Sequence, residues 1–276
     1  MPTDALNRTI DLPVPPRRIV SLVPSLTEYL FAIGRGPYVV GVTDYCIAPA
    51  AQVASLPKVR GTKNPNRELI RALQPDLVLA AKEENRERDV IALTAMGIPV
   101  YVTDIQSVAD ALTQLTALAQ ILAADHTAAP LLYALETALE QAQQSLIGRR
   151  RQRTLVFIWR DPWMAVGGTT YVDDVLRLCG AENLARQMPG RYPRADLADF
   201  MRLNPDVILL PDEPYHFTEA DRAAFAPFAA VTAVATQRMY LCDGMLLTWP
   251  GPRTIAALRT LPGLLEEPST DFQAGP

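Results

Sequence analysis

The stretch Leu73-Gln74-Pro75-Asp76-Leu77-Val78-Leu79 recurs later in the chain as Leu203-Asn204-Pro205-Asp206-Val207-Ile208-Leu209. The spacing from residue 76 to residue 206 is 130 residues. In both copies a helical pattern ends, Pro-Asp turns the chain, and an apolar run predicts a buried strand. The repeat therefore predicts two halves of similar design in this chain of 276 residues.

Strand-like and helix-like segments alternate around both copies. Short apolar runs predict strands at 19–22, 39–42, 76–80, 100–102, 154–159, 206–210 and 239–242. Apolar residues at helical spacing predict helices at 25–33, 65–73, 87–96, 107–122, 130–147, 170–179, 196–203, 218–225 and 251–261. This alternation predicts an α/β fold with parallel sheets that are covered by helices on both faces.

Residues 130–147 contain no glycine and no internal proline, which predicts one long helix between the halves. The expected regions are an N-terminal lobe at 1–125, a linking backbone helix at 126–150, a C-terminal lobe at 151–265 and a frayed tail at 266–276. Ligands of open parallel sheets bind beyond the carboxyl ends of the strands. Two lobes that face each other across the helix would share one cleft at those ends.

Several polar residues are predicted to cap helices. The spacing of a capping box occurs at Ser25–Glu28, Ser107–Asp110 and Thr218–Asp221. Asn64-Pro65 has the form of an N-cap followed by the first helical residue. The segment 43–63 before it is predicted to be a long loop.

The composition excludes several classes of protein. The 26 basic and 30 acidic residues give a net charge of −4, so the basic footprint of a nucleic-acid-binding protein is missing. The only two histidines, His126 and His216, cannot build a catalytic site of three histidines, and GxSxG, P-loop and CxxC motifs are absent. We therefore expect no enzyme activity, no catalytic residue and no catalytic cofactor. His216 follows a predicted strand and is a candidate cleft residue.

No segment has the pattern of a membrane span or an export signal. No run approaches the roughly 18 uninterrupted apolar residues of a span. Residues 1–16 lack a basic segment followed by an apolar one, so this chain shows no secretory signal.

Aromatic residues cluster in loops that follow predicted strands. Their flat apolar faces suit a large planar ligand, and arginines beside them suit its carboxylate or phosphate groups. The candidate ligand-binding residues are Tyr45, Trp163, Met164, Tyr192, Tyr215, Trp249, Arg160 and Arg253. The alternative is that each aromatic ring plugs the end of its own sheet and that the arginines pair with Asp161 or Asp243.

Two of the three cysteines, Cys46 and Cys242, also follow predicted strands. If the strand ends face a ligand, these thiols are candidate ligands of a soft metal ion. The alternative is that both are small apolar fillers of the core. Cys179 lies on the apolar face of a predicted helix and is not a candidate.

A further set of motifs keeps its order along the chain. They are Ile19-Val20-Ser21-Leu22-Val23-Pro24-Ser25-Leu26-Thr27-Glu28, Val40-Gly41-Val42-Thr43, Leu56-Pro57-Lys58-Val59, Pro75-Asp76-Leu77-Val78-Leu79, Leu178-Cys179-Gly180-Ala181-Glu182-Asn183, Arg191-Tyr192-Pro193 and Asn204-Pro205-Asp206-Val207-Ile208-Leu209. Together they resemble the class III substrate-binding proteins of ABC importers, in the branch that binds cobalamin and iron siderophores. Its sub-branch of helical backbone metal receptors is similar at Gly61-Thr62-Lys63-Asn64-Pro65-Asn66, Glu83-Glu84-Asn85-Arg86 and Leu246-Leu247-Thr248-Trp249. The resemblance implies two Rossmann-like lobes joined by one long backbone helix, with little hinge motion.

The resemblance also implies functional residues. Tyr45 and Tyr192 fall on aromatic positions that contact cobalamin in the family, and Met164 falls where a phenylalanine stands. Glu68 matches the glutamate by which the first lobe docks on arginines of the membrane subunit. Asp199 lies next to the corresponding position of the second lobe.

The implied function is non-enzymatic binding of a metal chelate by a monomer. The chelate is a corrinoid, haem or a ferric siderophore, held in the cleft between the lobes and delivered to the membrane subunits of an ABC importer. The family implies a periplasmic or cell-surface location. The competing hypothesis is a cytoplasmic two-lobed protein or chelatase-like enzyme that handles a tetrapyrrole or metal chelate, because this chain shows no export signal.

Overall fold

The computed structural model describes residues 2–12, 15–148 and 150–266, so most of the predicted tail at 266–276 lies outside the described residues. The chain divides into two compact units: unit 1 is Met1–Thr137 with Trp249–Ile255, and unit 2 is Ala138–Thr248 with Ala256–Pro276. Two helices, α6 (Asp125–Ser145) and α11 (Pro252–Leu265), each contain a boundary between the units. The long helix predicted at 130–147 is observed as α6. Within the described ranges, no helix combines the length and the apolar character needed to cross a bilayer.

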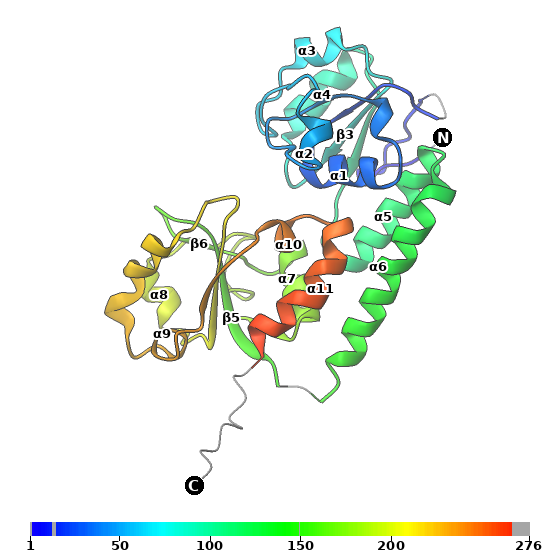
Figure 1. The fold of residues 1–276 in the computed structure, drawn as a ribbon. Helices are drawn as coiled ribbons and strands as arrows, with labels where there is room; N and C mark the ends of the chain where they lie inside the picture. The colour runs from blue at the N-terminus through cyan, green and yellow to red at the C-terminus, as the bar shows by residue number, and fades with distance from the viewer. Residues whose placement is uncertain (1, 13–14, 149, 267–276) are drawn as a thin grey trace. The chain divides into compact units, whose positions relative to one another are not determined.

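Unit 1 is built on a four-stranded parallel sheet with the order β2-β1-β3-β4. Its strands are β1 (Ile19–Ser21), β2 (Val39–Val42), β3 (Leu77–Ala81) and β4 (Val100–Thr103). Its helices are α1 (Pro24–Ala32), α2 (Ala50–Val53), α3 (Arg67–Ala72), α4 (Glu87–Ala95), α5 (Val108–Ile121) and the 3-10 helix η1 (Gly36–Tyr38). Figure 1 shows α1, α3 and α4 around β3. The short helix α2 lies inside the segment 43–63 that is predicted as a loop.

Unit 2 contains a sheet with the order β6-β5-β8-β9, and β7 also pairs with β5. Its strands are β5 (Gln152–Trp159), β6 (Met164–Ala165), β7 (Ala181–Asn183), β8 (Val207–Pro211) and β9 (Met239–Cys242). Its other helices are α7 (Tyr171–Leu178), α8 (Leu197–Met201), η2 (Glu219–Phe228), α9 (Thr232–Ala235) and α10 (Met245–Thr248). Strand β6 is antiparallel to β5 and the other pairs are parallel. Figure 1 shows α8 and α9 on one side of β5 and α7 and α11 on the other, which confirms the α/β fold class.

The internal repeat forms the same turn in both units. Gln74 has a φ of 48° and Asn204 a φ of 46°, so both are left-handed where the chain leaves α3 and α8. The pattern of buried and exposed residues is the same over 73–80 and 203–210. In each copy the apolar run that follows becomes an inner strand of its sheet, β3 or β8.

The aspartate of each copy fastens two neighbouring strands together. Asp76 accepts hydrogen bonds from the backbone N–H groups of Arg17 and Arg18, at 2.8 and 2.9 Å. Asp206 accepts the corresponding bond from Arg153, at 3.1 Å. In return, the N–H of Asp76 donates to the carbonyl of Arg18 at 2.9 Å, and the N–H of Asp206 to that of Arg153 at 2.7 Å. These reciprocal bonds fix β1 beside β3 and β5 beside β8.

The predicted capping box at Ser25 and Glu28 is wrong. Helix α1 begins at Pro24, so Ser25 lies buried in its first turn, and Val23 at the N-cap makes no side-chain hydrogen bond. A proline fits the first turn because no N–H is needed from it there. The carboxylate of Glu28 pairs instead with Arg253, which is distant in the sequence.

The other predicted caps come closer to the structure. Ser107 caps α5 by accepting a backbone hydrogen bond at 3.0 Å, and Thr218 and Asp221 form a capping box, as predicted. That box opens η2, which is a 3-10 helix. Helix α3 begins later than predicted, because its N-cap is Asn66 and not Asn64.

Replacing Asp76 by alanine should lower the free energy of unfolding by about 1–3 kcal/mol, because two backbone N–H groups lose their acceptor. Asp76→Asn should cost less, since an amide oxygen still accepts. The control Glu140→Ala removes an exposed carboxylate from α6 and should change this free energy by less than about 0.5 kcal/mol. Urea unfolding followed by circular dichroism measures all three. An Asp76→Ala variant as stable as Glu140→Ala would contradict this role of the carboxylate.

Candidate functional site

In unit 2 a series of aromatic rings connects the core to the carboxyl end of the sheet. The Phe157 ring on β5 lies 5.0 Å from Trp163 and 5.1 Å from Phe200, measured between ring centroids. Trp163 stacks on Phe217 at 6.0 Å with an interplanar angle of 17°, and Tyr215 lies 4.6 Å from Phe217. Phe157, Phe200 and Phe217 are buried, whereas Trp163 and Tyr215 are half-buried. The predicted site residue Trp163 is therefore packed against the buried rings of Phe157 and Phe217.

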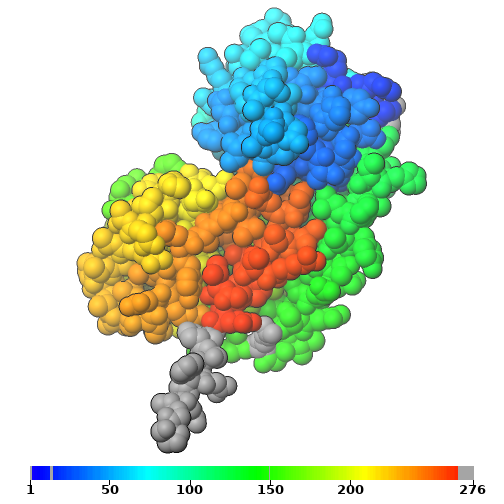
Figure 2. Space-filling model, in the orientation of Figure 1, coloured from blue at the N-terminus to red at the C-terminus, as the bar shows by residue number. Residues whose placement is uncertain are grey.

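The outermost rings are Trp159 and Tyr215, which we call the aromatic platform. Trp159 ends β5 and is 42% exposed, and its centroid lies 5.7 Å from that of Tyr215 in an edge-to-face arrangement of 69°. Figure 2 shows the surface of unit 2 in colours that run from green through yellow to red along the chain. Met164, a predicted ligand residue, pairs with Trp159 across β5 and β6. Trp159, like the other loop aromatics, is identified by its place at the end of a predicted strand.

Arg160, at the end of β5, already has a carboxylate partner. Its Nη1 lies 2.5 Å from Oδ1 of Asp221 and its Nε lies 3.7 Å from Oδ2 of Asp161. The guanidinium carbon lies 5.7 Å from the centre of the Trp163 ring. Burial alone raises the pKa of Asp221, but hydrogen bonds from Thr218 and Arg160 outweigh it and leave that pKa below its usual value. The hydrogen bond to Asp221 in turn raises the pKa of Arg160. This pair supports Trp163 and leaves Arg160 neutralised.

Tyr192 lies in a loop that follows the edge of β6. The N–H of Gly167 donates to the carbonyl of Arg191 at 2.8 Å, and that of Ala165 to the carbonyl of Pro193 at 3.1 Å. These bonds hold the loop against the strand that carries Met164. The half-buried Tyr192 thus belongs to the same edge of unit 2 as the aromatic platform.

In unit 1 the loop after β2 exposes Tyr45 and Ile47, which are 62% and 53% exposed. Cys46 between them is 0% exposed, because alternate residues of this loop face opposite sides. Tyr45 lies against Gly61, where a Cβ would come within 3.1 Å of its Cε2. The Nζ of Lys58 donates to the carbonyl of Cys46 at 3.2 Å and holds the loop. Tyr45 is thus the open aromatic candidate of unit 1.

Asn85 is a buried residue that fixes three loops of unit 1. Its Nδ2 donates to the carbonyls of Leu22 and Thr62, at 3.4 and 2.9 Å, and its Oδ1 accepts from the N–H of Ala81 at 2.8 Å. It therefore ties the ends of β1 and β3 to the loop that carries Thr62. Two of its partners, Leu22 and Thr62, are distant in the sequence, so no local pattern predicts this role.

Trp249 and Arg253 lie together in unit 1. Trp249 is 5% exposed, and the guanidinium carbon of Arg253 lies 5.3 Å from the centre of its ring. Nη2 of Arg253 lies 3.1 Å from Oε1 of Glu28. The expectation that Trp249 offers an open face is wrong, since its ring is buried. Arg253 does form an ion pair, and its partner within unit 1 is Glu28.

The two candidate metal-binding thiols are held in their protonated form. The Cys46 thiol lies 3.1 Å from the hydroxyls of both Thr27 and Thr43, and burial raises its pKa. The pKa of Cys242 is raised to about 12, mainly by burial and to a smaller extent by the negative charges of Asp212 and Asp243. Metal ligation requires a thiolate. In the part of the chain that the structure describes, no three His, Cys, Asp or Glu side chains gather as a metal site. The complete burial of Cys46 favours the filler alternative for that thiol, whereas Cys242 is half-buried.

The two candidate docking residues are exposed on the first turns of short helices. The Glu68 side chain on α3 is 66% exposed and lies 2.8 Å from Nη2 of Arg71. The Asp199 side chain on α8 is 48% exposed and pairs with Arg202. Each unit thus presents one carboxylate with a neighbouring arginine.

The thiols of the native protein should resist alkylation by iodoacetamide at pH 8, where all three thiols of the urea-unfolded chain should react. The folded state holds the Cys242 proton more tightly than the unfolded state, whose pKa is near 9.0. Its contribution to stability is therefore complete below pH 9 and is lost as the pH rises toward about 12. Mass spectrometry counts the adducts. Rapid labelling of Cys242 in the native protein would contradict a raised pKa.

Comparison with known proteins identifies the family of the chain. The family model for periplasmic binding proteins matches residues 19–245. The chain is 31% identical over 265 residues to the uncharacterized ABC transporter substrate-binding lipoprotein YvrC of Bacillus subtilis (strain 168), a match that covers 94% of this chain and 82% of that protein.

Two further relatives have names that state a ligand. The chain is 28% identical to the vitamin B12-binding protein of Pectobacterium carotovorum subsp. carotovorum (strain PC1), over 72% of each chain. Its fold matches the periplasmic heme-binding protein RhuT from Roseiflexus sp. RS-1 with a TM-score of 0.79 and 25% identity, over 90% of this chain and 97% of that one. The resemblance inferred from the motifs is confirmed: the chain belongs to the periplasmic binding protein family, whose members include substrate-binding proteins of ABC transporters.

Proposed function

We propose that this chain binds a metal tetrapyrrole, a corrinoid or haem, and delivers it to an ABC importer. The observation that carries the proposal is the aromatic platform of Trp159 and Tyr215 at the carboxyl end of the unit 2 sheet. The relatives named as vitamin B12-binding and heme-binding proteins support this class of ligand. They also support a binding protein over the alternative of a chelatase-like enzyme.

The platform is suited to a planar ligand because its rings are rigid before the ligand arrives. Trp163 and Phe217 are stacked beneath it, and Phe217 is 2% exposed. Rings that are already packed lose little conformational freedom on binding, so more of the contact energy remains for the ligand. We assign the ligand contacts of unit 2 to Trp159, Tyr215, Met164 and Tyr192. In unit 1, taken by itself, Tyr45 is the exposed aromatic candidate.

The charges near the platform disfavour a ferric siderophore of high negative charge more strongly than a tetrapyrrole. A ferric catecholate carries several negative charges, which need cationic partners. The guanidinium of Arg160 beside the platform is already paired with Asp221 at 2.5 Å. Its attraction for a further anion is therefore reduced, whereas the apolar Trp159 side chain beside it remains 42% exposed.

We also propose that Glu68 and Asp199 dock on arginines of the importer. Exposed ion pairs contribute only about 0–1 kcal/mol. Glu68 and Asp199 can therefore leave Arg71 and Arg202 and pair with arginines of a partner at little cost in free energy. Until then, each neighbouring arginine holds its carboxylate in an ordered position on α3 or α8.

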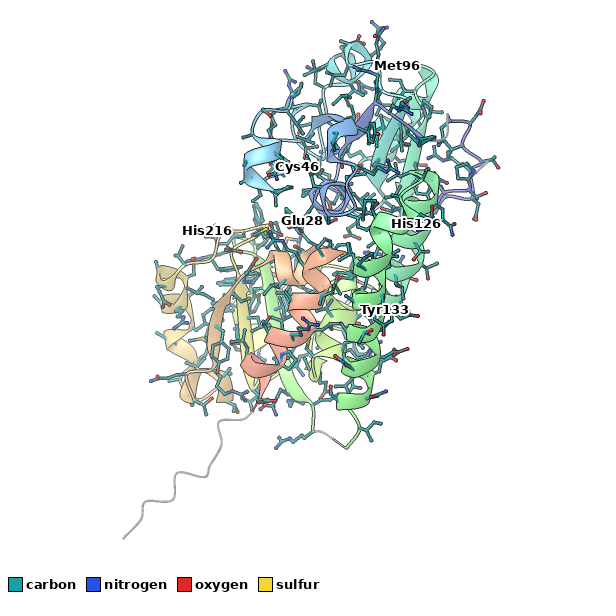
Figure 3. The ribbon with its side chains drawn as sticks, turned by 45° about the vertical axis from the view of Figure 1, so that its right-hand side comes forward. Glu28, Cys46, Met96, His126, Tyr133 and His216 are labelled. Carbon is teal, nitrogen blue, oxygen red and sulfur yellow. The ribbon has the colours of Figure 1, made fainter. Side chains whose placement is uncertain are left out.

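Replacing Trp159 or Tyr215 by alanine should weaken the binding of hemin or aquocobalamin by about three- to tenfold each, because one face of ring contact is lost. Quenching of tryptophan fluorescence measures the affinity for Tyr215→Ala, and visible absorption measures it for both. The matched control is Tyr133→Ala, since Tyr133 is 72% exposed on α6 and lies outside the proposed site (Figure 3). If neither platform variant loses affinity while the wild type binds, the platform is not the site.

The double variant Glu68→Arg/Asp199→Arg should abolish uptake of the ligand by cells that depend on this protein, because it places like charges against the arginines of the importer. The affinity of the purified variant for the ligand should stay unchanged. Glu140→Arg is the control for added positive charge and should leave uptake at the wild-type level. Uptake of radiolabelled ligand gives the comparison, and full uptake by the double variant would remove these carboxylates from the docking surface.

A further inference from the structure

One histidine lies beside the aromatic platform. His216 follows Tyr215 directly in the loop between β8 and η2 and is exposed. Figure 3 labels it in unit 2, and His126, the only other histidine of the sequence, at the start of α6. The function described above does not use His216, although an exposed imidazole is an effective metal ligand.

The hydrogen bond made by His216 determines which ring nitrogen is available. Its Nδ1 lies 3.3 Å from the carbonyl oxygen of Asp212. A carbonyl only accepts, so in the neutral ring Nδ1 carries the proton and donates it to this bond. Nε2 is then unprotonated and has a free lone pair. Metal-binding histidines in proteins commonly have this arrangement, with one nitrogen bonded to a carbonyl and the other on the metal.

The loop that carries His216 is fixed on both sides. The N–H of Asp212 donates to the carbonyl of Cys242 at 3.1 Å, and its Oδ1 accepts from the N–H of Gly244 at 2.8 Å. After the histidine, Phe217 is buried and its N–H donates to the carbonyl of Pro211 at 3.3 Å. A Cβ at Gly244 would lie 2.8 Å from the carbonyl of Glu213, so the neighbouring loop packs closely against this one. The imidazole is therefore held on an ordered backbone next to the platform.

We propose that His216 binds the metal of the tetrapyrrole through Nε2. This inference rests on the proposed function, and it narrows the ligand to chelates with an exchangeable axial position, such as ferric haem or an aquocorrinoid. A hexadentate ferric siderophore has no open position for an imidazole. The platform then contributes apolar contact and His216 contributes selectivity for the metal centre.

Hemin is the probe that tests this assignment. Wild-type protein with bound hemin should show the absorption and electron paramagnetic resonance spectra of imidazole-ligated ferric haem. His216→Ala and His216→Gln should lose that signature and bind hemin more weakly, by at least the roughly tenfold that removal of an outer-shell partner causes. Added imidazole should restore the signature in His216→Ala. The control His126→Ala removes the other histidine and should keep the wild-type spectrum.

The possible failures are distinguishable. If wild type binds hemin and both His216 variants have its spectrum and affinity, the inference is overturned and the proposed function stands. The same holds if His126→Ala, and not His216→Ala, loses the signature. If wild type binds neither hemin nor aquocobalamin, the proposed function fails and the inference fails with it. Thermal melts of all variants exclude a loss of fold, since replacing an exposed ring should leave the melting temperature unchanged.

Discussion

Two aspartate side chains hold the strands on which the rest of the molecule is built. Neighbouring parallel strands are not joined by a tight hairpin, so their register must be set by contacts between distant segments. Asp76 and Asp206 supply such contacts by bonding the backbone at the start of the adjacent strand. Once the starts are aligned, the carboxyl ends are aligned too. In unit 1 the loop that carries Tyr45 follows the carboxyl end of β2. In unit 2 the loop that carries Tyr215 follows the carboxyl end of β8.

The unit 2 site depends on continuity between the core and its surface. Phe157 belongs to the core, Trp163 packs on it, and the exposed rings of the platform lie above. The ion pair of Arg160 with Asp221 closes the edge of this arrangement. The same packing that stabilises unit 2 therefore keeps the platform rigid. A substitution at Trp163 would disturb both stability and binding, which is why the outer rings report on the ligand more cleanly.

The sequence predicted those features that depend on short segments. The repeat, the order of strands and helices, the cap of α5 and the box at Thr218 are local patterns, and the structure agrees with them. The ion pair of Glu28 with Arg253, the burial of Trp249 and the bonds of Asn85 to Leu22 and Thr62 depend on residues far apart in the sequence. The short strands β6 and β7 were missed because two or three residues give no periodicity. For the site, residue type and position after a strand were informative, whereas exposure was not predictable.

The central claim is that the ligand is a metal tetrapyrrole rather than another iron chelate. The most direct measurement is native mass spectrometry of the full chain after incubation with an equimolar mixture of hemin, aquocobalamin and a ferric catecholate siderophore. The expected result is a complex whose added mass is that of one of the two tetrapyrroles. A complex with the siderophore, or only the free protein, would contradict it.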